Sequence, residues 1–306
     1  MKLSVSNIAW EAKDDIIIFQ KMKDLGFSGL EIAPTRIIQE APYDHTQEAV
    51  TFAKTIEENY GFTIPSMQSI WYGIQDKVFG TEAERARLIT YTKKAVDFAE
   101  AIGCTNLVFG CPQNRAIPES TNSKSTDIKS DNQKAGTHKT EIQNTAVSFF
   151  RELGDYAHKH HTTIAMEANP PIYHTNYINT TEEAIHLIQT VNSEGFKLNL
   201  DVGTMIENNE AISVLHGAAH LINHVHISEP GLTQIKERSL HKKLADFLCA
   251  ASYPGYVSIE TGKRNSKEKK KGKESKNGKE DKDGRNDENN LNDLLRMMEY
   301  VAEIFA

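Results

Sequence analysis

Short apolar runs that end in an acidic residue or a histidine recur along the second half of the chain, and they constrain the fold more than any other feature. Residues 164–167 form such a run, which ends in Glu167 and is broken soon afterwards by two prolines. The arrangement recurs at Asp201, His226 and Glu260, at separations of about 34, 25 and 34 residues. Each separation is close to one strand-plus-helix unit of an eightfold α/β barrel, which keeps its chemistry at the carboxyl ends of its strands. We therefore expect these four side chains to converge.

The whole chain alternates strand and helix patterns. Strands are expected over 3–10, 29–34, 64–70, 106–110, 163–167, 197–202, 223–227 and 256–261. Helices are expected over 14–25, 46–60, 82–102, 141–160, 181–191, 210–219, 239–250 and 291–305. Eight alternations predict a single α/β domain over residues 1–306, a (β/α)8 TIM barrel. A doubly wound sheet is the alternative, but no Gly-x-Gly-x-x-Gly turn follows the first strand.

Two polar stretches interrupt this alternation. Residues 118–139 follow the fourth strand, and residues 263–290, of lower complexity, follow the eighth. Neither holds enough large apolar side chains to offset the entropy of ordering, so we interpret both as flexible insertions on the carboxyl-end face. Two roles are open for them: a lid that folds over substrate, or a solvated insertion that the fold tolerates.

Charge and cysteine usage narrow the class of protein. The formal net charge of −7 argues against a nucleic-acid backbone as the main partner. No apolar stretch approaches the ~20 residues that span a bilayer, and no secretory pattern opens the sequence. The three cysteines, Cys104, Cys111 and Cys249, are too scattered for a disulfide framework, so we expect a cytoplasmic protein. The oligomeric state stays open, with a homo-oligomer among the options.

The three carboxylates at the strand ends would repel one another if they share a pocket. Two of them ~4 Å apart would do so by roughly 4 kcal/mol at an effective dielectric constant of 20. Protons could neutralise them, but the nearby imidazole of His226 favours a divalent cation. Carboxylates with one histidine suit Mn²⁺, Mg²⁺, Co²⁺ or Zn²⁺. Each residue also has a structural interpretation as a cap or ion-pair partner, and His224 shares a strand face with His226, so either could be a core histidine.

Four motifs around these residues resemble those of the xylose-isomerase-like TIM barrels, a superfamily that includes ketose 3-epimerases, hydroxypyruvate isomerase, inosose dehydratase and endonuclease IV. The motifs are Met166-Glu167-Ala168-Asn169, Leu200-Asp201-Val202-Gly203, His224-Val225-His226-Ile227-Ser228-Glu229 and Ser258-Ile259-Glu260. The resemblance covers nearly the whole chain outside the two insertions. It implies that Glu167, Asp201, His226 and Glu260 hold one divalent metal ion. It also implies that Glu167 and Glu260 form the acid/base pair of a sugar or sugar-phosphate isomerase or epimerase.

The reaction that the resemblance implies is proton transfer through an enediolate. A metal ion on the carbonyl and hydroxyl oxygens stabilises that intermediate, while one carboxylate removes a proton and the other returns it. An inosose-dehydratase-like lyase and a catalytically degenerate sugar-binding barrel are the alternatives. An AP endonuclease is disfavoured, because Gln68 and Cys111 stand near positions where endonuclease IV has zinc-binding histidines. Thr204 stands where many members of the superfamily have a histidine.

Further candidates for binding a small carbohydrate lie at or beyond the expected strand ends. These further candidates are Trp10, Glu31, Gln68, His224, Glu229, Lys236 and His241. Trp10 could stack on a sugar ring, and the polar side chains could bond sugar hydroxyls or a phosphate. Each could equally serve packing or internal hydrogen bonding.

Overall fold

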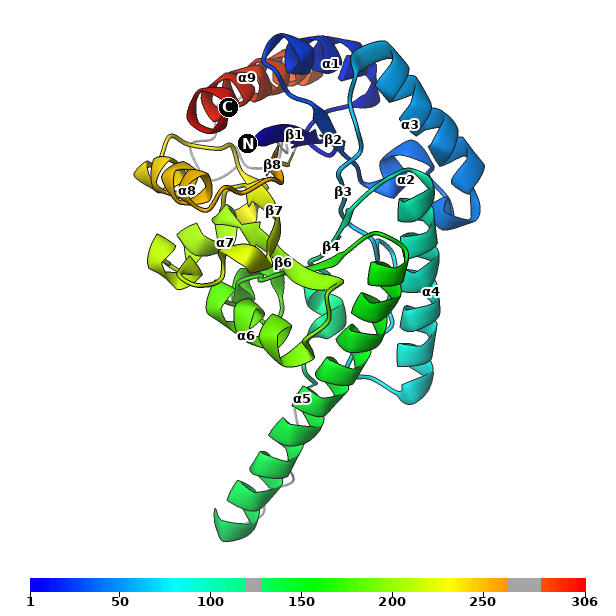
Figure 1. Ribbon diagram of the computed structural model, residues 1–306, viewed down its shortest axis with the longest axis vertical. Coiled ribbons are helices and arrows are strands. Elements are labelled where there is room, and N and C mark those ends of the chain that lie inside the picture. The colour runs from blue at the N-terminus through cyan, green and yellow to red at the C-terminus, as the bar shows by residue number, and fades with distance from the viewer. Residues whose placement is uncertain (119–127, 263–281) are drawn as a thin grey trace, which may run out of the picture.

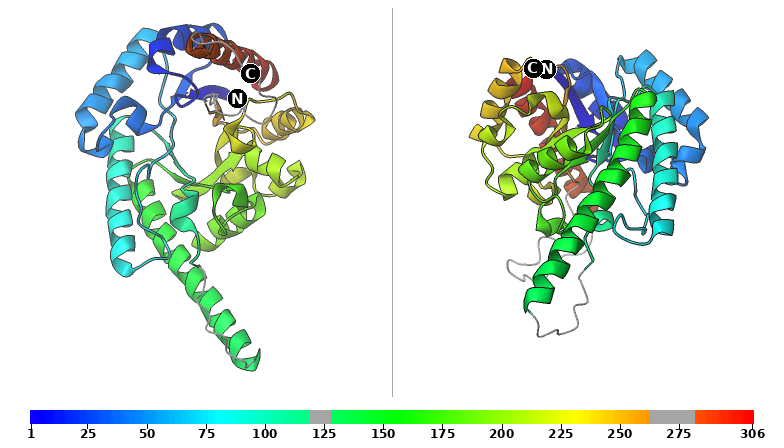
Figure 2. Two further views of the ribbon diagram at one scale, coloured as in Figure 1. Left: turned by 180° about the vertical axis from the view of Figure 1, so that it is seen from behind. Right: turned by 60° about the horizontal axis from the view of Figure 1, so that its bottom comes forward.

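The computed structural model describes residues 1–118, 128–262 and 282–306, excepting the side chains of residues 128–138 and 282–289. Of the two predicted insertions, at 118–139 and 263–290, residues 119–127 and 263–281 lie outside the described residues, and the remaining parts belong mostly to α5 and α9. Eight parallel strands surround one axis, and helices surround the strands (Figure 1). The N- and C-termini lie side by side at one end of the molecule, where α1 packs near α9 (Figures 1 and 2).

The strands follow one another around the barrel in the order β2-β1-β8-β7-β6-β5-β4-β3. Backbone hydrogen bonds close the ring between β2 and β3, since the Ile32 N–H donates to the Ser66 carbonyl and Gln68 N–H donates to the Ile32 carbonyl. This closure confirms the predicted TIM barrel and excludes the doubly wound sheet. The strands are β1 Lys2–Ser6, β2 Gly29–Glu31, β3 Ser66–Met67, β4 Asn106–Phe109, β5 Ile164–Glu167, β6 Phe196–Asp201, β7 Ile222–Ile227 and β8 Tyr256–Ile259.

The helices form the outer layer. They are α1 Asp15–Asp24, α2 Pro34–Ile37, α3 Thr46–Tyr60, α4 Glu82–Ala101, α5 Ile128–Lys159, α6 Thr181–Val191, α7 Val202–Glu207, α8 Ser239–Ala250 and α9 Lys282–Phe305. Short 3-10 turns occupy Ala12–Asp14, Pro42–Asp44, Pro112–Arg115, Pro171–Tyr173, Ile212–Leu215, Ala219–Leu221 and Pro230–Leu232. In the described part of the chain, none of the helices combines the length and apolarity that crossing a membrane requires.

Local sequence signals explain most helix boundaries. Thr81 with Glu84 and Thr180 with Glu183 form capping boxes at the starts of α4 and α6, which satisfies backbone N–H groups that would otherwise lack partners. Gly61 ends α3 in the left-handed conformation. Both α6 and α8 have the predicted bounds.

Three of the expected helices differ from prediction by more than two residues, and the short helix α2 was not expected. The expected helix over 210–219 is wrong: α7 begins directly after β6, because the Asp201 side chain accepts the Thr204 N–H and caps it. The following stretch contains the 3-10 turn Ile212–Leu215 instead. Helices α5 and α9 begin earlier than predicted, and the first turns of α5 extend away from the barrel (Figures 1 and 2).

Candidate metal centre

Four side chains meet at the carboxyl ends of neighbouring strands. Glu167 ends β5, Asp201 ends β6, His226 lies near the end of β7, and Glu260 directly follows β8. One donor atom from each lies within 4.8 Å of the others. The Nδ1 atom of His226 is 3.0 Å from Glu167 Oε1 and 3.2 Å from Glu260 Oε2. The convergence expected from the sequence is thus present in the fold.

The register of the parallel sheet causes this convergence. Asp201 of β6 pairs with His226 of β7, and His226 pairs with Ser258 of β8. The Glu260 N–H then donates to the Ile227 carbonyl at 3.0 Å, which extends the ladder by one residue and aligns Glu260 with the others. Because parallel strands in register end at one rim, side chains far apart in sequence become neighbours there.

Hydrogen bonds fix both oxygens of the Asp201 carboxylate. Thr204 donates to Oδ2 through its backbone N–H at 2.7 Å and through its hydroxyl at 2.8 Å. The Ser228 hydroxyl donates to Oδ1. Thr204 and Ser228 therefore orient the Asp201 carboxylate.

A chain of hydrogen bonds also fixes Glu167. Asn199 Nδ2 donates to Oε1 at 2.7 Å, and Asn169 Nδ2 donates to Oε2 at 3.0 Å. The Oδ1 atom of Asn169 accepts from Arg115 Nη2 at 2.9 Å. Arg115 is completely buried and also donates to backbone carbonyls, including that of Gly110. The sequence assigns no role to Asn169, Asn199 or Arg115. Asn199 lies within β6 and Asn169 lies two residues after β5, whereas Arg115 lies in the 3-10 turn Pro112–Arg115 beyond β4 and carries no local signal.

Burial and mutual repulsion disturb the ionisation of the cluster. Burial raises the pKa of Glu260 to about 7, opposed by His226 and reinforced by Glu167 and Asp201. Burial and the Glu167 charge raise the pKa of Asp201. Burial acts to lower the pKa of His226, but Glu31 and Glu260 outweigh it and raise that pKa well above its usual value. Three carboxylates and one imidazole nitrogen are a donor set that suits a divalent cation, so the residues fit a metal ion.

The cluster opens on a small cleft of about 180 Å³. Gln68, Asn169, Tyr173 and Leu232 line it together with the three carboxylates, and no lysine, arginine or histidine side chain is among its described lining residues. Tyr173, which sequence analysis missed, accepts the Gly231 N–H at 2.8 Å and so joins the loop after β5 to the loop after β7. Burial raises the pKa of Tyr173 to about 12, so its hydroxyl keeps its proton.

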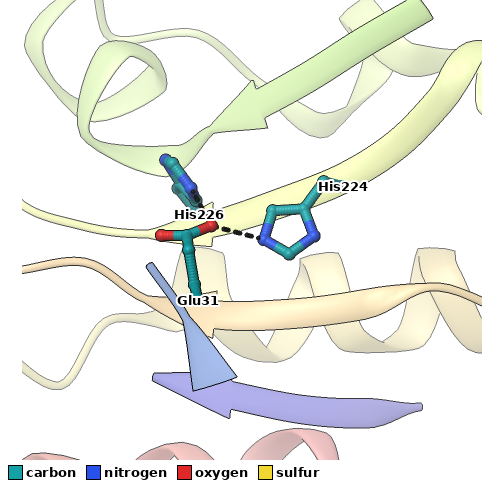
Figure 3. A group of neighbouring side chains, drawn as sticks. All are labelled: Glu31, His224 and His226. Atoms are coloured by element: carbon teal, nitrogen blue, oxygen red, sulfur yellow. Dashed lines mark hydrogen bonds and ion pairs between the residues drawn. The ribbon is translucent and has the colours of Figure 1, made fainter. Parts of the chain in front are cut away.

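Of the other residues predicted to bind substrate, only some lie near the cleft. Gln68 reaches the cleft, whereas Glu31 and His224 lie in the barrel interior, completely or almost completely buried (Figure 3). Trp10 is buried and donates from Nε1 to Asp15 Oδ1 at 2.7 Å.

The three predicted binding residues that follow β7 lie away from the cleft. Glu229 forms a two-point ion pair with Arg238, with both contacts at 2.6 Å. The Nδ1 atom of His241 lies 3.0 Å from the Tyr300 hydroxyl, and Lys236 is exposed. These three residues and Trp10 are outside the cleft lining.

Comparisons with known proteins agree with the fold. Residues 19–282 match the family described as xylose isomerase-like TIM barrel. A search of curated protein sequences finds no match.

Several solved structures share the architecture. D-psicose 3-epimerase from Clostridium cellulolyticum H10, crystallised with D-tagatose, has a TM-score of 0.71 and 16% identity, covering 100% of this chain and 99% of that one. The apo form of 3-keto-D-glucoside 4-epimerase from E. coli has a TM-score of 0.67 and 18% identity, covering 97% and 99%. A family 2 AP endonuclease from Brucella melitensis has a TM-score of 0.62 and 19% identity, covering 87% and 95%. At these identities the similarity shows the fold alone.

Proposed function

Because the chain belongs to the xylose isomerase-like TIM-barrel family, we propose that it is a divalent-metal-dependent isomerase or epimerase of a small carbohydrate. The observation that carries this proposal is the convergence of Glu167, Asp201, His226 and Glu260 beside a cleft at the carboxyl-end face. Two of the similar structures are named as sugar epimerases, which supports the choice of reaction within the family.

In this proposal Glu167, Asp201, His226 and Glu260 hold one metal ion, with Mn²⁺ or Mg²⁺ favoured by the oxygen-rich donor set and Co²⁺ or Zn²⁺ as alternatives. A bound divalent ion supplies Lewis-acid stabilisation of a negatively charged enediolate. Asp201 cannot rotate freely, because Thr204 and Ser228 hold its two oxygens, so its role is to present a fixed donor.

Glu260 and Glu167 are the acid/base pair that we propose. Both side chains line the cleft, Glu167 at the end of β5 and Glu260 directly after β8, so both can reach a substrate bound there. Glu167 accepts hydrogen bonds from Asn169 and Asn199, which aim its carboxylate at the cleft. Two carboxylates on different strands can remove a proton from one side of a substrate carbon and return one to the other.

The cleft favours an uncharged sugar over a sugar phosphate. A phosphate dianion needs cationic side chains or a cluster of backbone N–H groups, and the described cleft lining holds three carboxylates and no cationic side chain. Gln68, Asn169 and the protonated Tyr173 hydroxyl suit the hydroxyl groups of a neutral carbohydrate.

The test combines metal analysis with isotope exchange. Purified protein is analysed for bound metal, and the Mn²⁺-loaded form is incubated with ketoses and sugar phosphates in D₂O before metal removal and NMR. We expect deuterium at one carbon of a neutral sugar, and loss of exchange in Glu260→Gln. Bound metal without exchange across the panel would favour a lyase or another reaction, and a protein that binds no metal would refute the proposal.

A further inference from the structure

Glu31 of β2 contacts His226, the histidine of the metal cluster, in the barrel interior (Figure 3). The His226 Nε2 atom lies 2.9 Å from Glu31 Oε2, whereas its Nδ1 atom faces Glu167 and Glu260 at 3.0 and 3.2 Å. Glu31 is completely buried and is not part of the cleft lining, so it cannot reach a substrate there. Its contact with the cluster runs through the imidazole ring.

We infer that Glu31 is a positioning residue that holds the Nε2–H of His226 and thereby leaves Nδ1 free to bind the metal ion. The inference rests on the proposed function. A histidine binds a metal through an unprotonated ring nitrogen, and the hydrogen bond made by the other nitrogen decides which one that is. With Nε2–H donated to Glu31, the Nδ1 lone pair points at the carboxylates of the cluster.

Neighbouring donors hold Glu31 itself in place. Gln68 Nε2 lies 3.2 Å from Glu31 Oε1 and donates to Ser6 Oγ at 2.6 Å. His224 Nε2 lies 3.0 Å from Glu31 Oε2, at ion-pair distance, and makes no hydrogen bond elsewhere among the described residues. The carboxylate therefore cannot turn away from His226 without leaving buried donors unpaired, which is costly.

A second metal ion held by Glu31, His224 and His226 is the competing explanation, since their donor atoms also lie within 4.8 Å of one another. Each of these residues is at most 1% exposed. An ion there would have to be fully dehydrated and to share His226 with the cleft cluster. If Glu31 only positions His226, no dehydrated ion and no shared ligand are needed. The number of metal ions bound per chain therefore distinguishes the two explanations.

The test compares Glu31→Gln, Glu31→Asp and the unchanged protein by calorimetric titration of the metal-free chain with Zn²⁺ or Mn²⁺. Glu31→Gln keeps the shape but loses the charged acceptor, and we expect metal affinity to fall about 10- to 100-fold, as is typical when the partner of a ligating histidine is removed. Glu31→Asp retains a carboxylate and should recover part of the affinity. The ¹⁵N-labelled histidines supply a second readout: a downfield Nε2–H resonance of His226 that disappears in Glu31→Gln.

Asn106→Ala is the matched control for a general loss of stability. Asn106 is buried at the amino end of β4, where it bonds Ser66 and Asn223, so its removal should lower the Tm and leave metal affinity unchanged. Wild-type affinity in Glu31→Gln, or an Nε2–H resonance that persists in it, would overturn the inference. Two bound ions in the unchanged protein, with one lost in Glu31→Gln, would overturn it in favour of the second site. If the unchanged protein binds no metal, the proposed function fails, while the Nε2–H resonance still decides whether Glu31 holds His226.

Discussion

Proton competition at Glu260 should make metal binding depend steeply on pH. Burial raises the pKa of this side chain from an ordinary 4.5 to about 7, and a metal ligand must be deprotonated. At pH 6 the carboxyl is one pKa unit below its midpoint, so about one molecule in eleven is ionised, whereas most are ionised at pH 8. The affinity should therefore fall about tenfold between pH 8 and pH 6, equivalent to ~1.4 kcal/mol. The raised pKa values of Asp201 and His226 act in the same direction.

Calorimetric titration with Mn²⁺ at pH 6, 7 and 8, in two buffers of different ionisation enthalpy, measures both the affinity and the protons released. Near pH 6 we expect at least one proton to be released per bound ion. Glu260→Gln is the control, because it should bind more weakly and release about one proton fewer. An affinity that stays constant from pH 6 to pH 8, or equal proton release in Glu260→Gln, would refute the reasoning.

The same shift predicts how pH affects the stability of the metal-free protein. The folded-state pKa of Glu260 lies above its unfolded value, so the contribution of this group to the free energy of unfolding is largest below about pH 4.5 and is lost as the pH rises to about 7. A bound cation neutralises the ionised carboxylate. The increase in Tm that saturating metal produces should therefore be larger at pH 8 than at pH 6.

Three further predictions concern the scaffold. Arg115→Met leaves buried carbonyl oxygens without a donor and should lower the free energy of unfolding by about 3–5 kcal/mol in urea titrations; a loss below about 1 kcal/mol would contradict the role given to this guanidinium. Gly195→Ala would place a Cβ 2.2 Å from the Gly154 carbonyl oxygen, so we expect a stability loss of about 1–3 kcal/mol by thermal melting, and an unchanged Tm would show that α5 moves freely. Iodoacetamide at pH 7.5 should label exposed Cys249 in the native protein faster than half-buried Cys111, whose pKa burial raises to about 12. Mass spectrometry of the peptides checks this, and rapid labelling of Cys111 would contradict the raised pKa of its thiol.

The strand ends of the cluster could be predicted from the sequence, because a buried strand has a recognisable composition and the barrel imposes a recurring spacing. The run that ends in Glu167 is apolar until its last residue, and the structure places that residue at the rim. The parallel register then brings the strand ends together, since Asp201 of β6 pairs directly with His226 of β7. Helices such as α6 were equally clear, since Thr180 and Glu183 mark the start of α6.

Contacts between segments that are far apart in the sequence could not be predicted, because no local pattern marks them. Arg115 and Asn169 are 54 residues apart, and Glu31 and His226 are 195 residues apart. The expected helix over 210–219 was wrong for a related reason, since capping by Asp201 starts α7 at the strand end and leaves the later apolar residues in a 3-10 turn. A residue that serves both as a candidate ligand and as a helix cap cannot be assigned both roles from its local pattern.

Which of His224 and His226 belongs to the metal cluster is decided by their depth along the barrel axis, because both side chains lie on the same face of β7. Both side chains point inward, as the period of two requires, and their ring centroids are 5.4 Å apart. Only His226 is level with the rim, where β6 supplies Asp201 as its lateral neighbour; His224 lies one layer deeper, opposite Asn199. Glu31 contacts both rings, so one buried carboxylate joins the layer that faces the cleft to the layer beneath it. If β7 were shifted by two residues, His224 would take the place of His226 opposite Asp201. The alternation of side chains along the strand is the same in both registers, so it could not decide which histidine belongs to the cluster.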